Sequence, residues 1–87
     1  MRSDPITTAE LLVADHVSAR EGTQDFYVHV VWFCYILSGW KALVTTSLPD
    51  GRYYEITHDM VKRSIYMDTY IKKSNATYPE VWEKTDA

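Results

Sequence analysis

The segment from Val30 to Tyr54 constrains the fold of this chain more than any other. It contains three runs of β-branched, aromatic and other apolar residues, which are the residues that strands favour. Two turn signals separate these runs, Ser38-Gly39 and Pro49-Asp50-Gly51. Proline fixes one turn dihedral and glycine accepts a positive φ, so both breaks favour tight reversals. The pattern predicts an antiparallel sheet.

Length and composition limit what this sheet can belong to. A chain of 87 residues forms at most one domain with a single thin core. It is 46% hydrophobic and 14% aromatic, which predicts a folded domain and excludes a disordered one. Nine basic and twelve acidic residues give a net charge of −3, which argues against general binding to phosphate backbones. No signal peptide and no membrane-length apolar run is present, so we expect a soluble, cytoplasmic protein without membrane contact.

A helix is expected before the sheet. Thr7 can act as N-cap with Glu10 three residues later, which is the pattern of a capping box. Gly22 is a natural stop after Arg20. These signals predict a helix from Thr8 to about Arg20.

Four strands are expected, the first from Asp25 to Leu37. Because both of its faces become apolar, we expect this strand to be central and covered on both sides. Cys34, Trp32 and, in the next strand, Trp40 would then be buried in the core, the cysteine as an inert thiol. The other strands are expected at 40–46, 52–57 and 64 to about 72, the last as a half-exposed outer strand. A helix over residues 60–70 remains an alternative to the fourth strand.

The resulting fold class is α+β, with an N-terminal helix packed on a four-stranded antiparallel β-meander. Residues 1–78 are expected to form this single domain, and residues 79–87 a polar C-terminal tail. Trp82 is the one large apolar residue of the tail, where it either docks on the sheet or serves a partner surface.

Two stretches carry a family resemblance. The first runs Val31-Trp-Phe-Cys-Tyr-Ile-Leu-Ser-Gly-Trp-Lys-Ala-Leu-Val-Thr-Thr46, followed by Leu48-Pro-Asp-Gly-Arg-Tyr-Tyr-Glu-Ile-Thr57, and the second is Tyr66-Met-Asp-Thr-Tyr70. Together they resemble a family of small uncharacterised proteins of phages, prophages and mobile elements of Gram-positive bacteria. The resemblance covers roughly half of the chain and implies a phage or mobile-element accessory protein. It implies no activity and no catalytic residue.

Residues that carry catalytic chemistry are scattered. The histidines at positions 16, 29 and 58 have no metal-type spacing, and one cysteine with dispersed carboxylates does not complete a ligand set. His58-Asp59 and Cys34 are more simply a polar turn and a core thiol than catalytic groups. The three glycines all lie at expected turns and form no phosphate loop. We therefore expect no enzyme activity, no cofactor and no metal.

Tyrosines and cations form the remaining pattern. Tyr53, Tyr66 and Tyr70 could share one sheet face near basic residues, because residues 59–73 contain four basic and two acidic side chains. Aromatic rings and cations together suit single-stranded nucleic acid, although both also occur on ordinary sheet faces and edges. Aromatic side chains equally suit a protein interface. The candidate partner-binding residues are Tyr53, Tyr66, Tyr70, Tyr78, Trp82, Lys62, Arg63, Lys72 and Lys73.

The sequence thus predicts a non-enzymatic accessory protein that binds and modulates a host or defence-system protein. The alternative is a small nucleic-acid-binding regulator that uses the aromatic and basic face. A homodimer that holds a ligand between its subunits is a third option, because a thin sheet gains core by dimerising.

Overall fold

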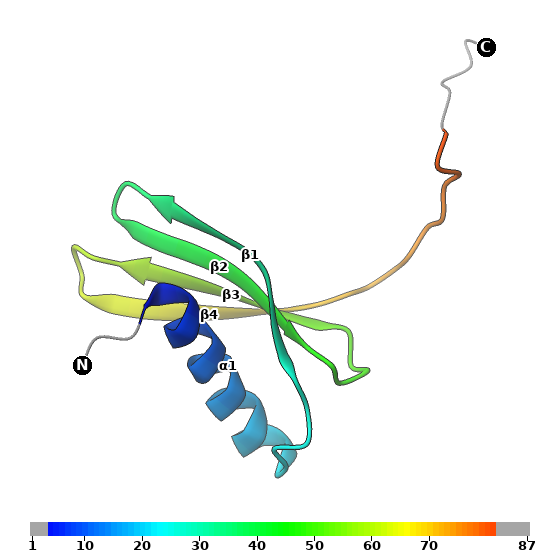
Figure 1. The fold of residues 1–87 in the computed structure, drawn as a ribbon, viewed down its shortest axis with the longest axis horizontal. Coiled ribbons are helices and arrows are strands. Elements are labelled where there is room, and N and C mark those ends of the chain that lie inside the picture. Colours follow the sequence, from blue (N-terminus) through cyan, green and yellow to red (C-terminus); the bar gives the residue numbers. More distant parts are fainter. Residues whose placement is uncertain (1–3, 82–87) are drawn as a thin grey trace.

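A computed structural model describes residues 4–81 as one helix and one antiparallel sheet (Figure 1). The helix α1 spans Pro5–Glu21 and precedes all four strands. The strands are β1 (Val28–Ile36), β2 (Gly39–Thr46), β3 (Arg52–Asp59) and β4 (Ser64–Ile71). Their order in the open sheet is β1-β2-β3-β4, so consecutive strands are neighbours throughout. The predicted α+β meander is confirmed.

Helix α1 begins earlier than its sequence signals suggested. Asp4, not Thr7, is the N-cap: its Oδ1 accepts a hydrogen bond from the Thr7 backbone N–H at 2.8 Å. The Thr7 hydroxyl donates to Asp4 Oδ2, also at 2.8 Å, and these bonds lower the pKa of Asp4. Pro5 occupies the first turn, where its missing N–H has no cost. At the other end Gly22 caps the helix with φ 70°, as predicted.

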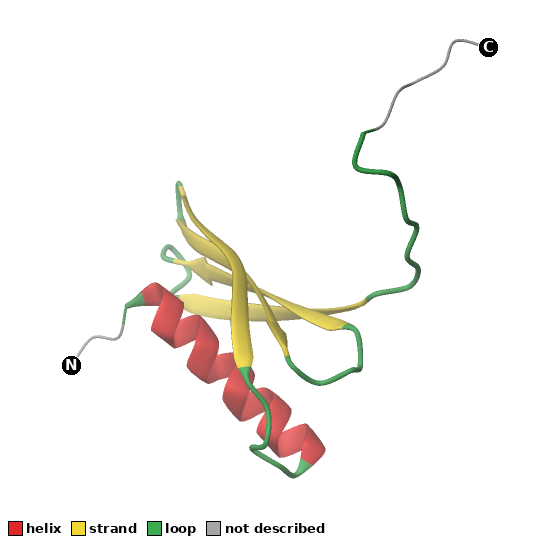
Figure 2. Cartoon of the chain, turned by 45° about the vertical axis from the view of Figure 1, so that its right-hand side comes forward, coloured by secondary structure: helices red, strands yellow, loops and turns green. Residues whose placement is uncertain are grey.

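The core lies between α1 and one face of the sheet (Figure 2). Three small helix side chains, Ala9, Val13 and Val17, are fully buried there. From β2 and β3 they meet the buried side chains of Trp40, Ala42, Val44, Tyr54 and Ile56. Small residues on the helix let it lie close to the sheet, which suits a domain with a single thin core.

Arg20 ties the last turn of α1 to the sheet. Its Nη1 donates to the hydroxyl of buried Tyr54 at 2.8 Å, and its Nη2 lies 3.2 Å from Asp50 in the β2–β3 turn. The buried phenol therefore has a hydrogen-bonding partner, as a polar group in a core requires. These contacts fix the position of the helix along β3.

The prediction that the first strand is central is wrong. In a meander the first and last strands are edges, so β1 pairs only with β2. A β-bulge between Val30 and Trp32 adds a residue and reverses the alternation of β1 halfway along. Consequently Phe33 packs toward the core, whereas Trp32 and Cys34 turn to the other face and are exposed. The expected buried thiol and the expected core position of Trp32 are both corrected.

The fourth element is a strand, so the helical alternative for residues 60–70 is wrong. A turn over residues 60–63 joins β3 to β4, and Asp59 Oδ1 accepts from the N–H groups of Val61 and Lys62. The expected position of β4 as a half-exposed outer strand is confirmed. Beyond it, residues 72–81 form no regular element and run away from the sheet (Figure 1).

The two strand tryptophans provide a test of this core. Trp40 is 7% exposed, whereas Trp32 is 39% exposed. We expect Trp40→Ala to lower the free energy of unfolding by about 3–5 kcal/mol, and Trp32→Ala by roughly half that or less. Urea denaturation followed by circular dichroism measures both. Equal losses would place Trp32 in the core and contradict the bulge.

Candidate functional site

The candidate site is the sheet face opposite α1, which we call the open face. No element of residues 4–81 covers it, as Figure 2 shows. Strand register arranges its side chains in rows that run from β1 to β4. Two central rows are Cys34–Lys41–Thr57–Tyr66 and Trp32–Leu43–Glu55–Asp68, and the row beside the β2–β3 turn is His29–Thr45–Tyr53–Tyr70.

Three predicted tyrosines lie together on this face. Tyr53 on β3 is directly opposite Tyr70 on β4, and Tyr66 lies four residues before Tyr70 on the same strand. Even spacing along a strand keeps Tyr66 and Tyr70 on one side of the sheet. Both remain substantially exposed, at 43% and 53%. The prediction that these three residues share a face is confirmed.

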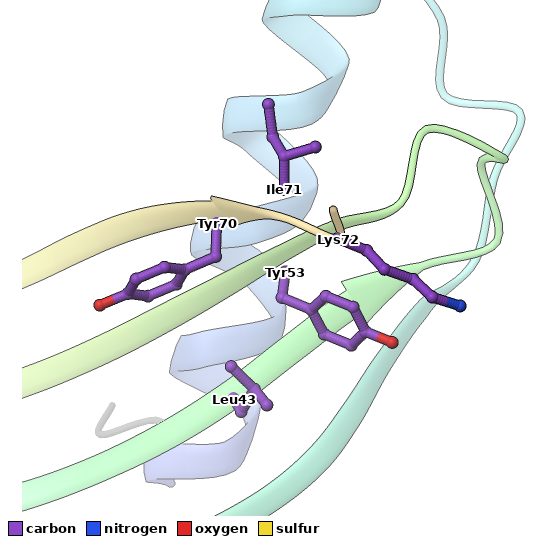
Figure 3. A pocket seen from close by; sticks show the side chains of 5 residues that line it. All are labelled: Leu43, Tyr53, Tyr70, Ile71 and Lys72. Atoms are coloured by element: carbon purple, nitrogen blue, oxygen red, sulfur yellow. The ribbon is translucent and has the colours of Figure 1, made fainter. Parts of the chain in front are cut away.

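A shallow, mostly apolar hollow of about 420 Å³ lies beside Tyr53 and Tyr70. Leu43 on β2 lines it together with Ile71 and Lys72, which lie at and just beyond the end of β4 (Figure 3). A hollow of this size accommodates one large side chain of a binding partner. The open face thus has an aromatic surface with one recess.

Two carboxylates occupy the centre of the tyrosine region. Glu55 on β3 is directly opposite Asp68 on β4, and such like-charge pairs are unfavourable. Lys41 Nζ lies 3.8 Å from Glu55 Oε2, and the Tyr70 hydroxyl is 3.4 Å from Glu55 Oε1. The nearby charges of Glu55 and, less strongly, of Asp68 raise the pKa of Tyr70, and burial contributes to the shift. The centre of the open face is therefore electronegative.

The β1–β2 half of the open face differs in character. Trp32, Cys34 and Leu43 form an apolar group there, beside Lys41 on β2. Sequence reasoning missed Trp32 and Cys34 as surface residues because it expected the first strand to be central and covered on both sides, whereas β1 is an edge strand with one uncovered face. The bulge brings both side chains to this face. The residue types from Val30 to Trp32 give no sign of a bulge.

The predicted cations do not form one patch. Lys62 and Arg63 lie in the β3–β4 turn, whereas Lys72 and Lys73 follow the opposite end of β4. The eight residues of β4 separate the two pairs, which corresponds to about 26 Å at ~3.3 Å per residue. Of the remaining candidates, Tyr78 is exposed beyond the sheet, and Trp82 lies outside the described residues.

Within residues 4–81 no cluster of three or more His, Cys, Asp or Glu residues could hold a metal ion. His16 packs edge-on against Tyr54, and His58 stacks on Trp40 with ring centroids 5.5 Å apart. Both imidazoles thus pack against core aromatic rings. Nor does any described helix have the length and apolarity needed to span a membrane.

Comparison with known proteins places the chain in a family. The profile of a family of unknown function, DUF6275, matches residues 6–80. The chain belongs to this family. The matched range includes α1 except Pro5, all four strands and most of the extended segment that follows them. Searches of curated proteins and of solved structures gave no match.

Tyr70 reports on the charge of the open face. Removing the Glu55 charge by Glu55→Gln should lower the pKa of Tyr70 toward its ordinary value of 10.0, because that charge is the largest cause of the increase. The raised pKa stabilises the fold below about pH 10, and this contribution is lost as pH rises through the pKa of the folded state. NMR titration of ring-labelled tyrosine measures the shift. Glu10→Gln on α1 is the control. If it changed the pKa of Tyr70 as much as Glu55→Gln does, Glu55 would not be the main cause of the raised pKa.

Proposed function

We propose that this chain is a non-enzymatic phage or mobile-element accessory protein that binds and modulates a host or defence-system protein. The open face would be its binding surface. The observation that carries the proposal is that exposed aromatic side chains lie together on one face of a sheet whose other face is packed against α1. Contiguous apolar patches of this kind mark interaction sites.

The composition of the face supports a protein partner. Tyr and Trp provide large contact area with few rotatable bonds and are enriched among residues that dominate interface energies. Trp32, Tyr53, Tyr66 and Tyr70 all lie on the open face. Four strands of about eight residues give a face roughly 20 Å by 25 Å. This area is of the same order as the ~800 Å² that each partner contributes to a standard interface.

Rigidity also supports recognition by this face. The four strands are held together along their lengths, and Tyr54 and Ile56 anchor the middle of β3 in the core directly behind Glu55. A preorganised surface loses little conformational entropy on binding. The genetic setting within the proposal comes from the sequence resemblance, which implies phages and mobile elements.

The nucleic-acid alternative receives less support from the same geometry. Asp68 lies between Tyr66 and Tyr70 on β4, and Glu55 lies beside it. Carboxylates among the rings repel the phosphates that stacked bases would bring with them. The cations that would neutralise those phosphates lie at the two ends of β4.

Affinity capture from a Gram-positive bacterial lysate, with and without nuclease, tests the proposal. We expect a stoichiometric protein partner that survives nuclease and is lost with the double variant Tyr66→Ala/Tyr70→Ala. The matched control is Leu11→Ala/Tyr35→Ala, because these side chains are 55% and 73% exposed on α1 and on the helix side of β1. It should retain the partner.

The other results are equally informative. Recovery of nuclease-sensitive material alone would favour the nucleic-acid alternative. A partner that is retained by Tyr66→Ala/Tyr70→Ala but lost by the control variant would move the binding surface away from the open face. Circular dichroism of each variant establishes that the sheet is intact before capture.

A further inference from the structure

We infer that the partner presents a basic side chain, best an arginine, to the carboxylates of the open face. This inference rests on the proposed function and specifies the chemistry of the partner. The observation that supports it is the arrangement of charged side chains around Asp68. Glu55 and Asp68 are direct cross-strand partners, so their side chains start about 5 Å apart and repel each other.

Among residues 4–81, only one of these carboxylates has a cationic partner. Lys41 pairs with Glu55 at 3.8 Å, from the β2 side. Asp68 lies two strands from Lys41, about 10 Å away across the sheet. Within residues 4–81 the Asp68 side chain makes no hydrogen bond or ion pair. The face therefore has an unneutralised negative charge on the side of β4.

The surroundings of Asp68 match a guanidinium group. Tyr66 and Tyr70 lie two residues before and two residues after it, on the same side of β4. A cation bound to the carboxylate between two exposed rings gains cation–π attraction as well as an ion pair. Arginine adds a planar, bidentate geometry that a lysine ammonium lacks.

The recess beside this position indicates a second feature of the partner. Leu43, Tyr53 and Tyr70 line the apolar hollow, and Leu43 lies in the same row as Glu55 and Asp68. An apolar side chain of the partner can fill this hollow while its neighbouring arginine reaches the carboxylates. The expected motif is thus an arginine adjacent to a large apolar residue.

A second copy of the chain fits this face less well. In a face-to-face dimer, the two copies each of Glu55 and Asp68 would meet at the centre with only the two Lys41 residues beside them, because Lys72 lies at the far end of β4 by the recess. Burying unpaired charge is strongly unfavourable. A basic partner neutralises the same carboxylates.

Selection from a random-peptide library on the immobilised full chain tests the inference. We expect enriched peptides to combine arginine with an apolar residue. Their affinity should fall about tenfold or more for Asp68→Asn, because the partner's cation loses its counter-ion. Glu10→Gln, which removes an acidic group on α1, should leave the affinity unchanged, and raised salt should weaken binding to the wild type.

The stability of Asp68→Asn separates a binding role from a structural one. Since Asp68 only repels Glu55 within the described structure, the variant should unfold at the same temperature as the wild type or higher. A lower unfolding temperature would show that Asp68 supports the sheet, and the loss of peptide binding would then have a structural cause.

Failures of the two proposals are distinguishable. Peptides that need Tyr66 and Tyr70 but lack basic residues and tolerate Asp68→Asn would overturn the basic partner and leave the open face as the binding surface. Peptides that bind Tyr66→Ala/Tyr70→Ala as well as the wild type would overturn both. A dimer in sedimentation velocity that Asp68→Asn strengthens would identify a second copy as the occupant.

Discussion

The packing of one helix against one face of the sheet determines the rest of this structure. Ala9, Val13 and Val17 form a single buried stripe, and a stripe of three small residues covers only one side of a four-stranded sheet. Hydrophobic burial is thereby confined to that side, and the hydrogen bond from Arg20 to Tyr54 sets the helix in place. Within residues 4–81 no second element covers the opposite side of the sheet, which is the face that we propose for a partner.

The bulge in β1 makes the difference between the two faces possible. Up to Val30 the strand directs its apolar residues toward the core, and after Trp32 the alternation resumes in the opposite phase. Phe33 consequently joins the core, and Trp32 takes a position on the open face. Without the extra residue, Phe33 would face solvent and Trp32 would point into the core beneath α1. The bulge thus supplies both a core aromatic residue and an aromatic residue for the open face.

Sequence reasoning reached the fold because local signals determine a meander. Gly39, with φ 155°, and Gly51, with φ 66°, lie at the predicted reversals, and a Cβ at Gly39 would collide with the carbonyl of His58. The positions of Cys34 and Trp32 depend instead on a register shift between β1 and β2. The local sequence gives no sign of this shift. Register also determined that Glu55 opposes Asp68, although they are thirteen residues apart in sequence. The tyrosine cluster was predictable from strand alternation, whereas the acidic centre among those tyrosines required the pairing of β3 with β4.

The acidic centre resolves a physical conflict on the open face. An aromatic sheet surface binds apolar surfaces with little discrimination, and exposed apolar faces promote association between copies. Charged groups within such a surface disfavour every partner that cannot neutralise them, a second copy included. Glu55 and Asp68 would impose this selection on the proposed binding face beside the exposed rings of Tyr66 and Tyr70. If the open face binds as we propose, the carboxylates make it selective at some cost to sheet stability, which is a trade expected of a binding surface.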